Sequence, residues 1–171
     1  MTQEFLDFIK SRQAIRSFTG ETIPKEDLLA IAEAGRHSPT SVNSQSRKFT
    51  IVQNKPMITE LEKALGSAMH QPNYDLYGAD ALILVSVPRH NNYGQIETAL
   101  AVQNMWLAAS ALGLGTTWTD QIRNLSDDPA VRKVFDQIDI PSTHICWTIL
   151  PVGVPAENPT PKTRTEEINF I

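Results

Sequence analysis

The sequence has almost no cysteine, since Cys146 is the only one among 171 residues. A single cysteine excludes an internal disulfide and a cysteine-rich metal site. Its neighbours Ile145, Trp147 and Ile149 are apolar, so we expect the thiol to lie in the core. The histidines lack the spacing of metal ligands, and no metal site is expected at positions 37, 70, 90 and 144.

Excess positive charge and long apolar runs are also absent. The formal net charge is −4, which argues against nucleic acid as the main partner, because phosphate backbones require a dense basic surface. No apolar run reaches the roughly 18 residues that a membrane span needs, and Met1–Phe5 lacks the basic start of a signal peptide. We therefore expect a cytoplasmic protein, without a membrane partner, that folds as one domain over residues 1–171.

Hydrophobic periodicity and capping residues predict a mixture of helices and strands. Helices are expected at residues 2–11, from about Pro24 to before Pro39, and at 55–65, 94–112 and 129–138. Strands are expected at residues 48–53, 81–87, 116–119 and 143–152. Gly66 is expected to end the third helix, and the segment Ser126–Pro129 to cap the last one. Because the elements do not alternate strictly as β-α-β, the pattern favours an α+β sandwich over a doubly wound sheet.

The predicted helix at residues 94–112 is apolar around more than one face, as Ile96 and Trp106 illustrate. Such a helix must be covered on several sides. In a chain of this size, we expect that cover to come from the core and from a second subunit. The last segment, residues 155–171, contains three prolines and few apolar residues, which predicts an extended tail that packs on the partner subunit.

Three polar groups stand out, and each has an ordinary explanation when taken alone. For the basic segment Arg12–Arg16, the ordinary explanation is two solvated arginines at the end of a helix. The uncharged loop SPTSVNSQS at residues 38–46 is rich in turn-forming residues. Lys162 and Arg164 would lie on one side of an extended segment, where a guanidinium and an ammonium can clamp a phosphate, although a solvated tail is the simpler reading.

The combination of these groups is more specific than any one of them. The segments are SRQAIRSF at residues 11–18, SPTSVNSQ at 38–45, QN, AA and GLGT between 103 and 116, and PKTR at 161–164. In this order they resemble the FMN-dependent nitroreductase family, as a short-chain member, over nearly the whole chain. The resemblance implies a three-layer sandwich with a mixed central sheet flanked by helices. It also implies an intertwined homodimer with one FMN in each of two interfacial clefts.

The resemblance further implies how the FMN phosphate is held. Arg12, Lys162 and Arg164 would bind it, with Gln13 and Ala14 as neighbouring contacts. Ala14 stands where the family often has serine, but a backbone amide serves a phosphate equally well.

Other residues are implied to surround the rest of the flavin. Arg16 would face the pyrimidine side of the ring system, where positive charge stabilises the anionic reduced flavin. The polar loop would come from the other subunit and line the flavin edge and the ribityl chain, which are neutral and rich in donors and acceptors. The loop residues concerned are Pro39, Thr40, Ser41 and Asn43. Asp120 and Gln121 would lie where a backbone amide approaches the hydride-accepting nitrogen.

Two departures from the family pattern bear on this pocket. Gln121 replaces a common glycine, and its side chain would either narrow the pocket or change the local backbone. Ser46 and Arg47 replace a common proline and aromatic residue.

The resemblance implies an FMN-dependent oxidoreductase with a ping-pong cycle. NADH or NADPH would pass a hydride to FMN and leave before a nitroaromatic, a quinone or a similar small oxidant takes its place. The chemistry would lie on FMN, so no catalytic side chain is expected. Gly113 and Gly115 lack the third glycine of a dinucleotide fingerprint and end a helix, so the nicotinamide cofactor would bind only transiently.

Two alternatives remain open at this point. One is a flavin-binding carrier or redox regulator with little turnover. The other is a different flavin reduction on the same fold, such as reduction of an activated alkene or removal of a halogen.

Residues 88–93 leave no room for the extra helices that cover the flavin in larger relatives, so a more open cleft is expected. Candidate aromatic contacts are Tyr74, Tyr77, Tyr93 and Trp118, although ordinary packing explains each of them as well.

Overall fold

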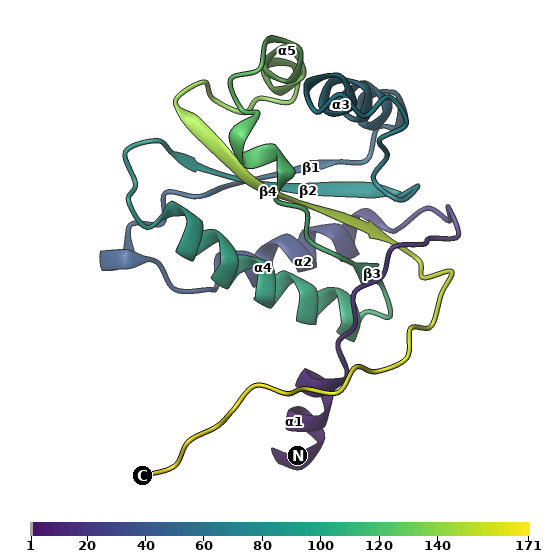
Figure 1. The fold of residues 1–171 in the computed structure, drawn as a ribbon, viewed down its shortest axis with the longest axis vertical. Coiled ribbons are helices and arrows are strands. Elements are labelled where there is room, and N and C mark those ends of the chain that lie inside the picture. Colours follow the sequence, from purple (N-terminus) through teal and green to yellow (C-terminus); the bar gives the residue numbers. More distant parts are fainter. Residues whose placement is uncertain (1) are drawn as a thin grey trace.

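A four-stranded sheet lies between two layers of helices in the computed structural model, which describes residues 2–171 (Figure 1). The strands follow the order β1-β2-β4-β3. Their bounds are Lys48–Val52 for β1, Ala81–Pro88 for β2, Gly115–Thr116 for β3 and His144–Gly153 for β4. The α+β sandwich is confirmed, but every strand pair is antiparallel. The expectation of a mixed sheet is therefore wrong for the sheet that the described residues form.

Helices cover both faces of the sheet (Figure 1). The helices are α1 (Thr2–Ser11), α2 (Lys25–Arg36), α3 (Lys55–Ala68), α4 (Gly94–Ala111) and α5 (Pro129–Gln137). Two short 3₁₀ turns, η1 (Ser41–Asn43) and η2 (Gln121–Asn124), connect other elements. Helices α3 and α5 lie on one face, and α2 and α4 lie on the other.

The side chains of β2 alternate between two hydrophobic cores. Leu82 and Leu84 belong to the core under α3 and α5, whereas Ile83 and Val85 belong to the core under α2 and α4. A strand with both faces buried has no polar side, which explains its continuous apolar sequence. Cys146 is fully buried in the first core, as expected, and burial raises the pKa of its thiol to about 12.

Two predicted boundaries were wrong. Helix α3 does not end at Gly66 but continues to Ala68. A Cβ atom at this glycine would lie 2.6 Å from the backbone oxygen of Gln71, so the position needs glycine for close packing rather than for a helix end. The strand expected at residues 116–119 is shorter, because only Gly115 and Thr116 pair with β4 as a strand and Thr119 forms an isolated bridge.

The N-terminal segment and the start of the tail run side by side at the β3 end of the sheet. The backbone N–H of Ile15 donates to the oxygen of Thr116 at 3.1 Å, and the N–H of Ala156 donates to the oxygen of Ser17 at 2.9 Å. Gly115 permits this approach, because a Cβ atom there would lie 2.7 Å from the Ile15 side chain. The segment that carries the basic residues and the start of the tail therefore meet in the fold.

Helix α1 and the C-terminal tail project away from the sandwich (Figure 1). Helix α1 has no buried residue, and the apolar side chains of Phe5 and Leu6 are exposed. The tail is extended, as expected, and residues 160–171 are exposed in the single chain. Within residues 2–171, no helix has the length and apolar character needed to cross a bilayer.

Asp80 joins three parts of the chain at the start of β2. Its buried carboxylate accepts hydrogen bonds from the N–H of Ile23 and the side-chain amide of Gln53, and it forms an ion pair with Lys55 at 3.1 Å. Burial alone would raise the pKa of Asp80. The donors of Ile23, Gln53 and Lys55 outweigh that effect and hold the pKa below its ordinary value.

We expect Asp80→Asn to lower the free energy of unfolding at pH 7 by about 2 kcal/mol, since the contacts of Ile23, Gln53 and Lys55 with the carboxylate lose their charge assistance. Because folding lowers this pKa, the stabilisation is fully present above about pH 4, the ordinary value, and is lost as the pH falls through the folded pKa. Urea unfolding from pH 7 to pH 3 measures the difference. The exposed Glu26→Gln change is the control, and a difference between wild type and Asp80→Asn that does not shrink below pH 4 would contradict the assignment.

Candidate functional site

Arg12 lies against helix α4 without an acidic partner. Its guanidinium carbon is 4.1 Å from the centroid of the Trp106 ring, and the indole N–H of Trp106 donates to the backbone oxygen of Gln13 at 3.1 Å. Within residues 2–171, Arg12 forms no ion pair. Burial lowers the pKa of Arg12, and the positive charge of Arg164 lowers it further. The positive charges of the two arginines therefore lie close enough to repel each other.

A hollow of about 380 Å³ opens beside Arg12. Residues that line it include Arg12, Gln13, Ser110, Leu114, Glu157 and Asn158. One carboxylate oxygen of Glu157 accepts a hydrogen bond from the backbone N–H of Arg16. A carboxylate of the chain itself thus accepts a hydrogen bond from the backbone of the basic segment.

The remaining members of the basic groups differ in their placement. The side chain of Arg16 is exposed, and Ala14 is half-buried against the core under α2 and α4. Lys162 and Arg164 are both exposed. The structure thus brings Arg12, Gln13 and Arg164 together, but it records no contact between Lys162 and the other two cations.

The polar loop has an unusual backbone. Val42, Asn43 and Gln45 have φ values of 47°, 55° and 47°, in the left-handed region that favours glycine. Thr40 accepts a hydrogen bond from the N–H of Gln45 at 3.2 Å, and the N–H of Ser41 donates to a carboxylate oxygen of Glu97 at 2.8 Å.

Side chains of the loop differ in exposure. Pro39 and Asn43 are exposed, whereas Thr40 and Ser41 are partly buried. The loop therefore presents polar groups outward from a backbone that the rest of the chain holds in place.

Helix α4 separates this loop from Arg12. Glu97, which holds the loop, and Trp106, which lies under Arg12, are nine positions apart in α4. Nine residues are about two and a half turns of an α-helix, so the two side chains lie on opposite sides of it. A single chain consequently does not bring the loop and Arg12 onto one side of α4.

Asp120 lines a small cavity on the same side of α4 as Arg12. The cavity has a volume of about 100 Å³, and its lining includes Thr98, Val102, Trp118, Asp120, Arg123 and Trp147. Val102 is one turn before Trp106, so the cavity and the Arg12 hollow follow one another along the helix. Trp118 is 52% exposed.

Gln121 neither blocks this cavity nor distorts the backbone. Its side chain is exposed, and it begins the 3₁₀ turn η2 without a positive φ. The position therefore does not require the conformational freedom of glycine in this structure.

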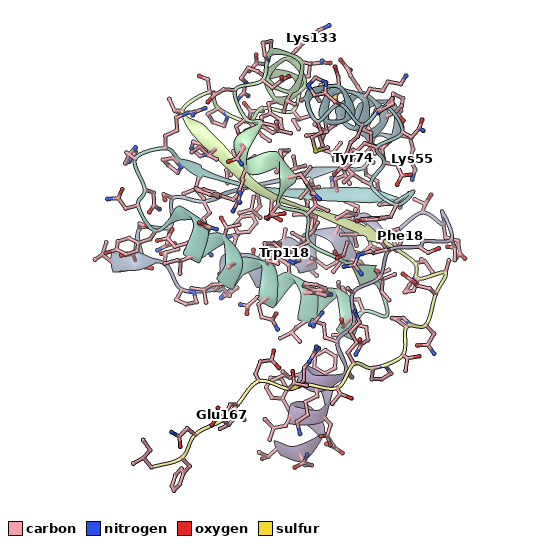
Figure 2. All side chains as sticks on the ribbon, viewed as in Figure 1. Phe18, Lys55, Tyr74, Trp118, Lys133 and Glu167 are labelled. Carbon is pink, nitrogen blue, oxygen red and sulfur yellow. The ribbon has the colours of Figure 1, made fainter. Side chains whose placement is uncertain are left out.

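The four candidate aromatic contacts differ in their placement, and Tyr74 lies away from the Trp118 cavity. It packs against the core under α3 and α5, and Figure 2 shows it and Trp118 on opposite sides of the sheet. Tyr93 is exposed beside the polar loop, where it borders the same pocket as Ser41. Tyr77 is partly buried in the connection before β2. No helix is inserted between β2 and α4, as expected from the short segment there.

Sequence reasoning missed Glu97 and treated Arg47 only as a departure from a pattern. Glu97 is only 2% exposed. A signal was present, because Glu97 is the only charged residue of α4, and a lone buried charge needs specific partners. Arg47 donates to Ser38, nine positions away, and to Glu97, fifty positions away, so no helix or strand spacing indicated these partners.

The donor groups fit the phosphate and the polar rim of FMN. Arg12 lacks an acidic partner, and the neighbouring Arg16 N–H already binds a carboxylate oxygen. The buried hydroxyl of Thr98, which lines the Trp118 cavity, has no hydrogen-bond partner among the described residues. Buried hydroxyls are normally paired, so this one suits a polar atom of a bound molecule. Residues 2–171 contain no cluster of three or more side chains suited to a metal ion.

Comparisons with known proteins identify a family that this chain resembles over most of its length. The model of the family described as the nitroreductase family matches residues 9–154. A protein of Methanothermobacter thermautotrophicus, provisionally named NADH dehydrogenase/NAD(P)H nitroreductase, is 29% identical over 91% of this chain and 80% of its own length. An iodotyrosine deiodinase of Thermotoga neapolitana is 26% identical over 95% of this chain and 94% of its own.

A solved structure extends the similarity to the fold. The nitroreductase of Bacteroides fragilis with bound FMN matches with a TM-score of 0.88 and 29% identity, covering 98% of each chain. The similarity therefore covers the strands, the helices and the segments that carry the polar groups.

We expect inorganic phosphate to raise the melting temperature by a few degrees over sodium chloride of equal ionic strength, because binding to the folded state stabilises it. Arg12→Met should remove most of this rise, and thermal unfolding monitored by circular dichroism measures it. Arg89→Met is a matched control, since Arg89 pairs with Asp127 instead. An undiminished rise in Arg12→Met would show that the Arg12 hollow does not bind the anion.

Proposed function

The chain belongs to the nitroreductase family, and from that premise we propose that it is an FMN-dependent oxidoreductase. It transfers reducing equivalents from NADH or NADPH to nitroaromatics, quinones or similar small oxidants. The observation that carries this proposal is Arg12, which lies over Trp106, forms no ion pair within residues 2–171, and is near enough to Arg164 for its pKa to be lowered by that charge. A cation so placed needs an anion, and the FMN phosphate is the anion that the family supplies.

In this proposal, Arg12 and Arg164 bind the phosphate from two sides, and Lys162 joins them from the same extended tail. Gln13 and Ala14 contribute backbone contacts. Guanidinium groups suit this role because each offers paired donors to phosphate oxygens. The carboxylate of Glu157, which lines the same hollow, must move aside when the phosphate enters, because the two anions repel.

Arg16 and the Asp120–Gln121 segment serve the ring end of the site. The exposed guanidinium of Arg16 is free to turn toward the pyrimidine side, where negative charge develops on reduction and where a fixed positive charge lowers the barrier. Asp120 lines the cavity between α4 and Trp118. The backbone amide of Gln121 begins η2 beside it, and we assign this amide to the reacting edge of the ring.

The polar loop completes the site from a second copy of the chain. Within one chain the loop and Arg12 lie on opposite sides of α4, so the loop residues must serve the site of a partner. These residues are Pro39, Thr40, Ser41 and Asn43. Exposed apolar side chains support a homodimer: Ile96 and Leu100 lie one turn apart on α4, and Phe5 and Leu6 protrude from α1. The tail, residues 155–171, would then pack on the partner.

When bound, FMN supplies the two-electron chemistry that connects the nicotinamide with the oxidant. The protein binds and orients FMN, and its positive charge stabilises the negative charge of the reduced flavin. The short connection before α4 leaves the Trp118 side open, which suits successive binding of the nicotinamide and the oxidant at one place. We assign the whole chain to one domain, since both cores share one sheet, and its cytoplasmic location stays a prediction.

Reductive removal of a halogen is the second candidate, because a deiodinase is among the relatives that match over most of their length. The reading as a carrier with little turnover loses its main sequence support, since Gln121 adopts an ordinary backbone and leaves the cavity open. Reduction of an activated alkene gains no specific support from the structure.

We expect the purified protein to be yellow and to release FMN on heating. Steady-state oxidation of NADH and NADPH with menadione, nitrofurazone and an iodinated tyrosine as separate oxidants distinguishes the candidates. Rapid turnover with menadione or nitrofurazone supports the first, and turnover confined to the iodinated substrate supports the second. A colourless protein that takes up no added FMN would contradict both.

We expect the double change Lys162→Ala with Arg164→Ala to weaken FMN binding about 100-fold, because two charge-assisted contacts to the phosphate are lost. Titration of the apoprotein, followed by quenching of FMN fluorescence, measures the affinity. Lys133→Ala with Lys63→Ala removes two exposed positive charges from α5 and α3 and serves as the control. Unchanged affinity in a dimeric Lys162/Arg164 variant would show that the tail does not bind the phosphate.

A further inference from the structure

The polar loop holds a backbone conformation that its own residues disfavour. Val42 is β-branched and has a φ of 47°, where its Cβ crowds the following carbonyl group. Its side chain is 96% exposed, so no packing within the chain offsets this cost. Asn43 and Gln45 also have positive φ values. Something outside the loop must therefore hold it in this shape.

Glu97 is the group that does so. Its two carboxylate oxygens accept hydrogen bonds from different places: Oε1 from the backbone N–H of Ser41 at 2.8 Å, and Oε2 from the side-chain amide of Asn91 at 2.9 Å. The Ser41 contact fixes the residue directly before the left-handed stretch. Asn91 also donates to the hydroxyl of Ser46 at 3.2 Å, just beyond that stretch. Both ends of the strained loop are thus connected to one buried carboxylate.

Arg47 adds a second connection to the same helix. Its guanidinium donates to the backbone oxygen of Ser38 at 2.8 Å and to the backbone oxygen of Glu97 at 2.9 Å. It also donates to the hydroxyl of Ser38 at 2.5 Å. Arg47, which departs from the family pattern, thus connects the start of the loop to the first turns of α4.

We propose that Glu97 is a positioning residue that holds residues 40–45 in their strained shape, so that the loop is already formed when it meets the flavin of the partner subunit. The inference rests on the proposed function, because it assigns the loop to FMN. Glu97 does not touch the flavin. It acts through the N–H of Ser41 and through Asn91, and it removes the ordering cost that a flexible loop would bring to binding.

Glu97→Gln tests this in the full-length dimer. We expect FMN affinity to fall about tenfold, since a charge-assisted hydrogen bond to Ser41 weakens and one oxygen acceptor becomes a donor facing Asn91. Amide hydrogen exchange of the FMN-free protein should become faster at residues 41–45 while β2 is unchanged. The exposed Glu26→Gln change is the matched control, and neither readout should respond to it.

A second substitution separates loop positioning from general stability. In the Glu97→Gln background, Val42→Gly should recover about threefold in FMN affinity, because glycine adopts the left-handed region without the Cβ cost. Val42→Ala keeps a Cβ atom and should recover little. A purely structural role for Glu97 would instead lower the melting temperature without rescue by glycine.

The outcomes distinguish this inference from the proposed function. If the wild type binds FMN and Glu97→Gln binds it equally well, only the positioning role is overturned. If the wild type does not take up FMN, the proposed function fails and this inference fails with it. Recovery by Val42→Ala equal to that by Val42→Gly would also overturn it, because backbone strain would then not be the property that Glu97 controls.

Discussion

The rest of the structure depends on the need to cover an apolar surface on both sides of β2. This central strand has no polar face, so one pair of helices must lie on each side of the sheet. Helix α4 meets this need on one face with Ala101 and Met105, which are fully buried. The same helix is apolar on its outer side as well, and that side remains exposed in the single chain. The helix that the fold requires therefore also presents an apolar surface, which would face the partner in the proposed homodimer.

The two flanks of α4 carry different chemistry. One flank bears Trp106, on which Arg12 lies, and continues to the cavity beside Trp118. The other bears Glu97, which binds the polar loop. Because the helix is rigid, the spacing between these groups is fixed within each chain. In the proposed homodimer, the position of the partner would then decide whether a complete flavin site forms.

Most of the fold could be predicted from the sequence, because its signals are local. The capping segment Ser126–Pro129 and the apolar run of β2 placed their elements correctly, and Asp128 is the residue that caps α5. Gly66 gave a wrong helix end, since a glycine that is needed for close packing cannot be distinguished in the sequence from one that ends a helix. The antiparallel sheet was missed because strand direction depends on the whole topology. For the site, the order of motifs indicated Arg12 and the loop. The roles of Glu97 and Arg47 were not predicted, because the contacts of Glu97 with Ser41 and with Arg47 join residues some 50 positions apart.

The separation of the loop from Arg12 by a single helix has a genetic consequence under the proposed arrangement. Each site in a homodimer would combine the phosphate cluster of one chain with the loop of the other. A chain with a defective Arg12 and a chain with a defective loop would each be inactive as homodimers. Mixed in one cell, they would form heterodimers in which one site inherits both defects and the other inherits neither. Two null alleles of this gene would therefore complement each other and restore up to half of the sites in every mixed dimer.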